Sequence, residues 1–532
     1  MQKLLVYLDF DAMRPSLAGD KLPYDALTLI SAVQGLVNRD APELFVAFDP
    51  ETDDFWLEQL RAPGKLLAER PVERIDTLLT FLNRYRTFIE EQGLVLWDEH
   101  VPASYNVAMT VCGVEGYLPV RGDPDGLLNL LTAPVKLDLR GKFTGKGTIE
   151  GTGRASSGSA KCDAYLWAME HYLDRTSKMH MGYAPDGASW STDGTWRYPD
   201  LGNASVPNRD FLIANRAFVF DLSPWADEPP SDDPTQPLGT DYATMTELFR
   251  RHYHLRGGVI AEVHGFVPWH IKYTVYDKKG KHKEVPSEWM FVEILSAYNL
   301  VMDADAYQFC GLANASVYQH YPLKPSYDNP PPPAVPYDPN KNYVMIYYGD
   351  YDAASWLVRF VPKWWTDPAR GTVPISWAFN PNLAGRVPMV FDYIFEHKTA
   401  NDHFIAGDSG AGYLNPTLLD APRRHSDLPS GTEAWVAHNQ AHMSRFGMRH
   451  VGFVINGDVR TTPETLAAYA RFTPDGSVFN TMPLDEDGHE LDHMLVNGMP
   501  AKRMDWDVGH FTMSNEEIVA SILERLEKEP GA

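Results

Sequence analysis

Residues 321–340 read YPLKPSYDNPPPPAVPYDPN, and this proline-rich stretch divides the 532-residue chain. Proline has no backbone N–H to donate within a helix or a central strand, so a stretch this rich in proline predicts an extended, stiff connector. A chain of this length is also too long for one ordinary hydrophobic core. We therefore expect an N-terminal domain over residues 1–335, a linker over 321–340 and a C-terminal domain over 340–532.

The N-terminal part alternates helix-like and strand-like patterns. Residues 25–38, DALTLISAVQGLVN, repeat their apolar side chains at helical spacing, and residues 44–48, LFVAF, predict a short buried strand. A similar pattern returns over residues 288–308, which suggests a mixed α/β domain of divergent α/β repeats. Residues 141–161 are rich in Gly, Ser and Thr and predict an exposed loop.

Short apolar runs recur along the C-terminal part, and helical patterns lie between several of them. The last helical pattern follows Ser514, and Glu517 completes a capping box with it. Alternation of this kind is typical of a parallel sheet, open or closed. The segment is short for eight βα units, so a reduced β/α barrel fits better than a full one.

Composition and charge narrow the class of protein. The net charge of −24 argues against nucleic acid and anionic membrane surfaces as partners. The three cysteines form no CxxC motif, which argues against a structural zinc site of cysteines and against a disulfide framework. The start MQKLLVYLDFD predicts a first strand rather than a signal peptide. We expect a cytoplasmic protein, or a secreted or periplasmic one if a leader has been removed.

Polar residues follow several of the predicted strands. Asp350 and Asp352 come after the run YVMIYY, and alternate residues of a strand share a face, so the two carboxylates could share one small volume. In βα architectures, chemistry is found at the C-terminal ends of the strands. The other candidates of this kind are Asn380, Asp408 and Asp458.

The stretch GDSGAGYLNP, residues 407–416, is the most unusual of these strand ends. Gly410 and Gly412 flank Ala411, so the backbone can turn tightly and approach a ligand. The spacing matches neither a phosphate-binding loop nor a serine nucleophile elbow. We expect Gly412 to hold a conformation or a close contact that a side chain would disturb, and Tyr413 to face a cleft.

The segment GAGYLNP resembles the signature of the GxGYxYP family, with Gly410, Gly412, Tyr413 and Pro416 in the matching positions and Asn415 where the second tyrosine would stand. The segments LISAVQGLVNRDAPELFV, NRAFVFDL, YYGDYDAASW and PISWAFNP resemble further segments of that family, in the same order. The resemblance implies a first domain of divergent repeats and a second domain that is a seven-stranded parallel β/α barrel. It also implies a glycoside hydrolase that acts on a carbohydrate in the cleft between them.

The resemblance further implies an acidic site made of a glutamate from the first domain and an Asp-x-Asp pair from the second. Asp350 and Asp352 match the pair, and Glu288 fits the spacing of the glutamate best. Two other glutamates could take that role, and we expect both to point into solvent: Glu262 in a strand-like run and Glu293 in the middle of a helix.

Glycosidic cleavage fits these residue types. It needs one protonated carboxyl group as acid and one ionised carboxylate as base or nucleophile, and crowding of acids raises one pKa. We assign Glu288 as the acid, Asp350 as the base or the group that positions water, and Asp352 as its assistant. The expected substrate-binding residues are Gly410, Gly412, Tyr413, Trp377, Asn380, Asp408 and Asp458.

Two alternatives stay open at this point. The protein could bind a sugar without cleaving it, and the departure at Asn415 favours that option slightly. It could also be a metal-dependent hydrolase, because an Asp-x-Asp pair can hold a divalent cation, with His403, Asp408 and Asp458 as further ligands. Otherwise we expect no cofactor.

Overall fold

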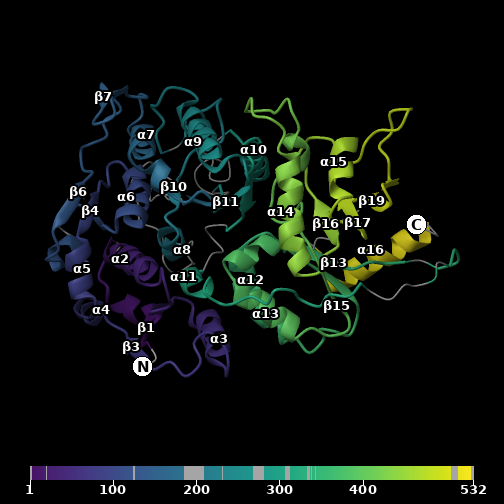
Figure 1. The fold of residues 1–532 in the computed structure, drawn as a ribbon, viewed down its shortest axis with the longest axis horizontal. Helices are drawn as coiled ribbons and strands as arrows, with labels where there is room; N and C mark the ends of the chain where they lie inside the picture. The colour runs from purple at the N-terminus through teal and green to yellow at the C-terminus, as the bar shows by residue number, and fades with distance from the viewer. Residues whose placement is uncertain are drawn as a thin grey trace.

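The computed structural model describes residues 3–19, 21–123, 126–184, 209–230, 232–267, 281–305, 312–331, 336, 338–341, 343–504 and 513–528, and the side chain of Asp350 lies outside this description. In Figure 1 the N-terminal part, coloured purple to teal, lies beside the C-terminal part, coloured green to yellow. Both parts mix helices with parallel sheets, which confirms the expected α/β class.

Three parallel sheets of the N-terminal part share one strand order. The first strand of each set lies between the second and the third. The sets are β1 (Leu5–Asp9), β2 (Leu44–Ala47) and β3 (Val72–Ile75); β4 (Leu94–Trp97), β5 (Leu118–Arg121) and β6 (Val135–Asp138); and β9 (His180–Tyr183), β10 (Phe218–Phe220) and β11 (Ala261–His264), the last extended by β12 (Leu300–Asp303). This shared order is what divergent α/β repeats would produce.

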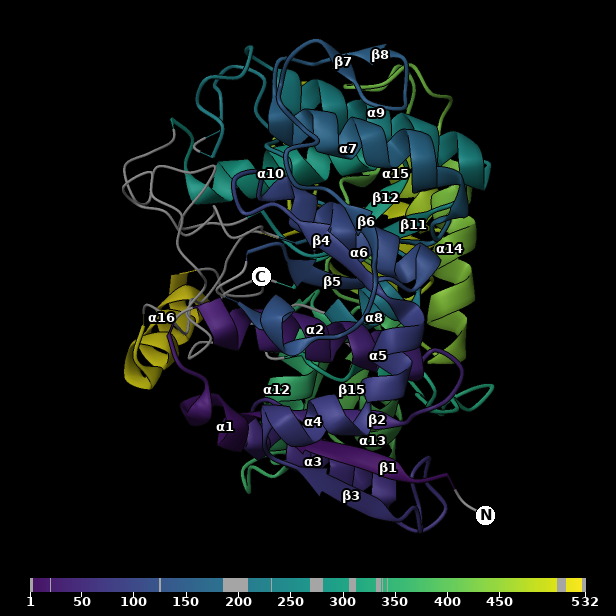
Figure 2. The ribbon, with the colours of Figure 1, turned by 90° about the vertical axis from the view of Figure 1, so that its left-hand side faces the viewer.

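Helices cover these sheets and pack between them. Figure 2 shows α2 between the sheet of β1 and the sheet of β4. Residues 25–37 of the predicted helical pattern fall within α2, which ends one residue before Asn38, and the run 44–48 contains β2. The helices of this part are α1 (Phe10–Met13), α2 (Lys21–Val37), α3 (Pro50–Arg61), α4 (Leu78–Arg84), α5 (Arg86–Gln92), α6 (Ala103–Glu115), α7 (Ala160–Tyr172), α8 (Arg209–Ala214), α9 (Thr240–Arg256), α10 (Glu284–Ser296) and α11 (Ala315–Tyr318).

Two segments between the regular elements were singled out from sequence. The glycine-rich segment 141–161 contains a short antiparallel pair, β7 (Thr148–Ile149) and β8 (Arg154–Ala155). The described residues of 321–340 lie in neither a helix nor a strand, as the density of proline predicts. The division into domains at this point remains a prediction.

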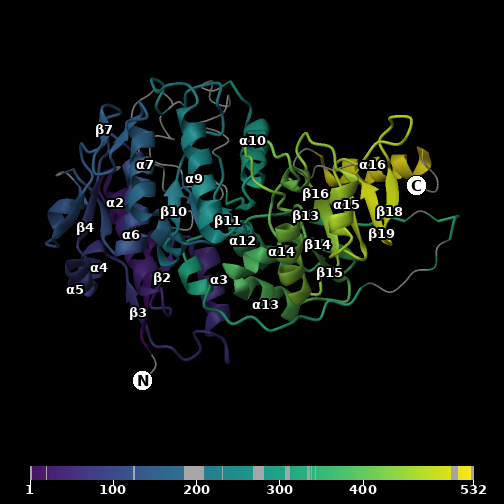
Figure 3. The ribbon, with the colours of Figure 1, turned by 45° about the horizontal axis from the view of Figure 1, so that its top comes forward.

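The C-terminal part contains two further sheets (Figure 3). One is parallel and joins β13 (Tyr347–Tyr351), β14 (Ile375–Phe379) and β15 (Asp402–Ile405) in that order. The other has the order β16 (His450–Val454), β17 (Gly476–Phe479), β19 (Met499–Arg503) and β18 (His493–Val496). A bridge between Ala406 and Val451 links the two sheets edge to edge. The helices are α12 (Ala354–Trp365), α13 (Pro388–Glu396), α14 (Thr432–Arg445), α15 (Pro463–Tyr469) and α16 (Asn515–Lys528).

The closed seven-stranded barrel that the resemblance implied is not found among the described residues. The strand β19 pairs in parallel with β17, but β18 joins β19 as an antiparallel edge strand, which a parallel barrel does not contain. The turn between them is Asn497-Gly498, with φ angles of 50° and 88°. An Asn-Gly pair is the strongest short-range signal for such a hairpin, because both of its residues tolerate positive φ. No pairing within the described ranges joins this hairpin to β13.

The last helix begins as expected. The backbone N–H of Glu517 donates to Oγ of Ser514 at 3.3 Å, and the N–H of Ser514 donates to the carboxylate of Glu517 at 2.7 Å. This reciprocal pair is the predicted capping box. None of the helices in the described ranges combines the length and the apolar composition that a membrane crossing requires.

Candidate active site

The glycine-rich loop of the C-terminal part is bound to an edge of the N-terminal part. The N–H of Met302 on β12 donates to the carbonyl of Tyr413 at 2.8 Å, and the N–H of Tyr413 donates back at 3.3 Å. The N–H of Asn415 donates to Oγ of Ser296 on α10 at 2.9 Å. The loop is therefore held between β12 and α10.

The end of β13 meets the same strand. The N–H of Ala304, directly after β12, donates to the carbonyl of Asp352 at 3.0 Å. The two strand-end segments singled out from the sequence, 350–352 and 407–416, thus converge on β12 from the C-terminal part. Glu288 lies on α10, the helix that precedes β12, so the N-terminal part supplies the third group at this junction.

Gly412 carries the constraint that we expected. Its φ angle is +114°, a region that L-residues rarely adopt, and a Cβ there would lie 2.8 Å from the side chain of Val301. Gly410 has a φ of +126° and a Cβ there would lie 2.2 Å from Oδ1 of Asn439. Both glycines therefore let the backbone pass close to neighbouring groups that a side chain would displace.

Tyr413 brings the predicted acids together. Its side chain is only 2% exposed, and its hydroxyl forms a hydrogen bond with Glu288. Burial, the charges of Glu288, Asp352 and Asp408, and the bond to Glu288 raise the pKa of Tyr413 well above its ordinary value. Three carboxyl groups from α10, the end of β13 and the 407–416 loop thus act electrostatically on one phenol, and that of Glu288 is also hydrogen-bonded to it.

The same burial corrects the expectation that Tyr413 faces an open cleft. Its face is covered in this structure, so it offers a hydroxyl to Glu288 rather than an open surface for a sugar to stack on. Trp377 is also a core residue. Its indole N–H donates to Asp402 at 2.8 Å and its ring packs against Trp365, so sugar stacking at Trp377 is not supported.

The other predicted binding residues divide into two groups. Asn380 is fully buried, and its Oδ1 would lie 2.8 Å from a Cβ at Gly407, so it faces the start of the glycine-rich loop. Asp408 is buried in the same loop. Asp458 has a side chain that is 70% exposed and forms a 3.5 Å ion pair with Arg424. Asn380 and Asp408 belong to the junction, whereas Asp458 lies at its surface.

Glu293 does not point into solvent as we expected. Its carboxylate is buried and pairs with Nε2 of His425 at 2.8 Å and with Arg424 at 3.3 Å. Burial alone would raise the pKa of Glu293, but the hydrogen bond from His425 and the charges of His425 and Arg424 outweigh it, and the pKa falls below its ordinary value. The helical pattern of α10 could not predict this, because the partners come from a loop far away in sequence.

Glu262 is also buried, which contradicts the expectation of a solvent-facing strand residue. On β11, Glu262 and His264 are two residues apart and share a face, and His180 on β9 pairs in register with Glu262. The hydrogen bond from His180 and the charges of the neighbouring histidines outweigh burial and lower the pKa of Glu262 below its ordinary value. Burial and the charge of Arg386 hold the pKa of His264 well below its usual range.

This group of His180, Glu262 and His264 is a candidate metal site that the sequence analysis did not predict. Among the described residues, no other group of three His, Cys, Asp or Glu side chains is placed to share one metal ion. The expected metal ligands are placed differently: His403 is half-buried on β15, while Asp408 lies at Tyr413 and Asp458 at the surface. A signal was present in the sequence, because AEVH puts two polar side chains on one face of an apolar strand.

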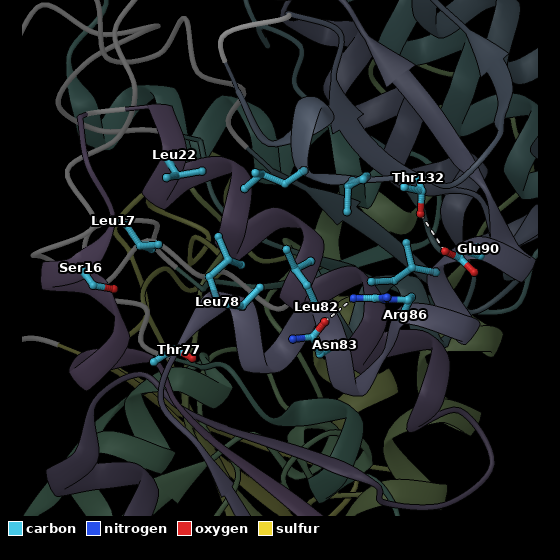
Figure 4. Close-up of a pocket in the computed structure, with 14 residues that line it drawn as sticks. Ser16, Leu17, Leu22, Thr77, Leu78, Leu82, Asn83, Arg86, Glu90 and Thr132 are labelled. Atoms are coloured by element: carbon cyan, nitrogen blue, oxygen red, sulfur yellow. Dashed lines mark hydrogen bonds between the residues drawn. The ribbon is translucent and has the colours of Figure 1, made fainter.

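A hollow of about 540 Å³ lies elsewhere, in the first α/β unit (Figure 4). Leucines make up much of its lining, including Leu17, Leu22, Leu78 and Leu82, with Arg86 and Glu90 beside them. It contains none of the predicted site residues. A smaller hollow of about 220 Å³ is bordered by His442 and by Pro381, Ala384 and Gly385.

Comparisons with known proteins agree with the sequence motifs. Residues 340–517 match the family model described as "GxGYxYP putative glycoside hydrolase C-terminal domain", and residues 91–176 match the model "GxGYxYP_N second domain". The fold resembles a crystal structure described as a "putative hydrolase from Bacteroides thetaiotaomicron VPI-5482", with a TM-score of 0.65 and 16% sequence identity over 99% of this chain and 85% of that one. No curated protein matches the chain.

Proposed function

Because the chain belongs to the GxGYxYP family, we propose that it is a glycoside hydrolase whose site lies where α10, β12, the end of β13 and the 407–416 loop meet. The observation that carries the proposal is the gathering of Glu288, Asp352 and Asp408 around the hydroxyl of Tyr413. Glycoside hydrolases need paired carboxyl groups on either side of the scissile bond. Here the acids come from both parts of the chain.

In this proposal Glu288 is the general acid and protonates the glycosidic oxygen as the bond from that oxygen to the anomeric carbon breaks. Asp350, with Asp352 beside it, accepts a proton from water or positions the water that adds to the anomeric carbon. The products are a sugar with a new reducing end and the released alcohol. The hydroxyl of Tyr413 orients the carboxyl of Glu288.

The support for Asp352 is its place at the junction, where its carbonyl accepts from Ala304 and its charge acts on Tyr413. Asp350 is proposed from its position on β13, two residues before Asp352. Gly412 and Gly410 support the proposal by letting the loop lie against β12 and α14, respectively, without side chains between them.

The test is a screen of the full chain against polysaccharides, oligosaccharides and aryl glycosides, with new reducing ends or released phenol as the readout. We expect turnover of at least one carbohydrate by the wild type and a loss of about 10²-fold or more in Glu288→Gln. Binding of glycans without any new reducing ends would reject the hydrolase and support a sugar-binding protein instead.

A further inference from the structure

The group formed by His180, Glu262 and His264 is built by the sheet of β9, β11 and β12. Glu262 and His264 share a face of β11, and the parallel register puts His180 directly beside Glu262. In the same register, Asp303 on β12 lies beside His264. Three adjacent strands therefore bring side chains that can bind a metal to one point. The residues of this group are far in sequence from Asp350 and Asp352.

The distances among the three ligand atoms fit one small cation. Nδ1 of His180 and Nε2 of His264 are 3.0 Å apart. Oε2 of Glu262 is 3.5 Å from Nδ1 of His180 and 3.7 Å from Nε2 of His264. Metal–ligand bonds of about 2.0–2.1 Å at a tetrahedral angle give ligand pairs about 3.4 Å apart. The triangle thus has the size of one face of a tetrahedral zinc site.

A second layer orients two of the three ligands. Nδ1 of His264 lies 3.1 Å from Oδ2 of Asp303, and Arg386 forms an ion pair with that same carboxylate oxygen at 3.1 Å. The Asp303 carboxylate also accepts from the N–H of Ala354. An ionised Asp303 would accept the proton on Nδ1 of His264 and leave the lone pair of Nε2 for a metal ion. A carboxylate placed in this way is the usual outer partner of a metal-ligating histidine.

Glu262 is oriented in a similar way. Nδ2 of Asn382 donates to its Oε1 at 3.1 Å, which leaves Oε2 directed at the two histidines. His180 has a side chain that is 25% exposed, so the group can be reached from one side. Two more histidines on α14, His438 and His442, lie within electrostatic reach of Glu262.

We propose that His180, Glu262 and His264 bind one divalent transition-metal ion of the Zn²⁺ type. Two imidazoles and one carboxylate form a donor set that suits Zn²⁺ and does not suit Ca²⁺ or Mg²⁺, which prefer oxygen ligands. Water or His442 completes the coordination. This site differs from the one that the Asp-x-Asp pair suggested. Asp303, which contacts His264, directly precedes Ala304, and the N–H of Ala304 donates to the carbonyl of Asp352.

The rival explanation needs no metal. A proton on Nδ1 of His180 could be shared between Nε2 of His264 and Oε2 of Glu262, which would make the group a buried hydrogen-bond cluster. The two explanations differ in a measurable way. Only the metal site predicts that a specific ion binds with a fixed stoichiometry and that substitution of these three residues removes it.

The experiment uses the full chain, freed of metal by chelation and dialysis. Zn²⁺ binding is measured by titration calorimetry, and bound metal by elemental analysis after desalting. The Co²⁺-loaded protein is examined for the intense visible bands of tetrahedral coordination. We expect one ion per chain in the wild type, and a loss of affinity of at least about 100-fold in His180→Gln and Glu262→Gln, because each removes a ligand.

Three further variants make the result specific. His489→Gln, at a side chain that is 80% exposed, and Asp352→Asn should both keep the ion. Asn382→Ala should weaken binding about 10–100-fold without abolishing it, as expected for an outer partner. Circular dichroism of each variant confirms that it is folded. No bound Zn²⁺ in the wild type, stoichiometry unchanged in His180→Gln and Glu262→Gln, or loss of the ion in Asp352→Asn would overturn the proposal.

Discussion

Replacement of Gly412 by alanine tests the packing of the glycine-rich loop against β12. A φ of +114° costs a non-glycine residue about 1–3 kcal/mol, and the 2.8 Å contact of the new Cβ with Val301 adds about 1–3 kcal/mol for overpacking in a buried site. We therefore expect a destabilisation of about 3 kcal/mol. For a unit of the size of the C-terminal part, this corresponds to a fall in Tm of about 6–12 °C.

The assay is differential scanning calorimetry of the wild type, Gly412→Ala and a matched control. Gly385→Ala is that control, because Gly385 has no positive φ and a Cβ there would meet nothing within 4 Å. Its Tm should stay within about 2 °C of the wild type. In a Val301→Ala background, the cost of Gly412→Ala should fall by about 0.5 kcal/mol or more. Equal Tm values for Gly412→Ala and Gly385→Ala would refute the reasoning.

Three further outcomes are expected. Tyr413→Phe should keep the Tm within a few degrees while turnover falls about 10-fold or more, because the acid loses the hydroxyl that orients it; unchanged turnover would exclude that role. Arg386→Met should cost about 3–5 kcal/mol in calorimetry, since it leaves buried carboxylates uncompensated, whereas Arg449→Met at an exposed pair should cost at most about 1 kcal/mol. Burial and the charge of Arg256 lower the pKa of His252 to about 3 in the folded protein. As the pH falls, the unfolded chain therefore binds a proton at His252 before the folded protein does, and stability should fall between about pH 6.5 and pH 3. In His252→Gln this fall should be shallower by up to about 1.4 kcal/mol per pH unit, and equal pH profiles would contradict it.

Local sequence patterns predicted the helices, strands and caps that depend on residues close together in the sequence. The helix containing residues 25–37, the strand at 44–47 and the capping box at Ser514 follow from periodicity and capping chemistry alone. The closed barrel is not confirmed among the described residues, where the Asn497-Gly498 turn places β18 antiparallel to β19 at the edge of its sheet. This hairpin has a local signal in the sequence, the Asn-Gly pair.

The roles assigned to the candidate site residues stay predictions. The structure brings Glu288, Asp352 and Tyr413, which were chosen for their motif positions, to the same junction. Trp377 was expected to bind substrate but is a core residue, because an aromatic residue near acids in sequence lies in the core more often than it stacks on a sugar. The burial of Glu262 could not be derived, because its partner His180 lies on a strand 82 residues earlier and only the sheet register brings them together.

The most direct test of the proposed hydrolase compares two glutamates on one helix. Glu288→Gln and Glu293→Gln make the same chemical change on α10, but only Glu288 contacts Tyr413, whereas Glu293 pairs with His425. With the carbohydrate that the screen identifies, kcat should fall about 10²-fold or more in Glu288→Gln, with substrate binding retained, and should change by less than about 10-fold in Glu293→Gln. A wild-type kcat in Glu288→Gln, or a large loss confined to Glu293→Gln, would contradict the account.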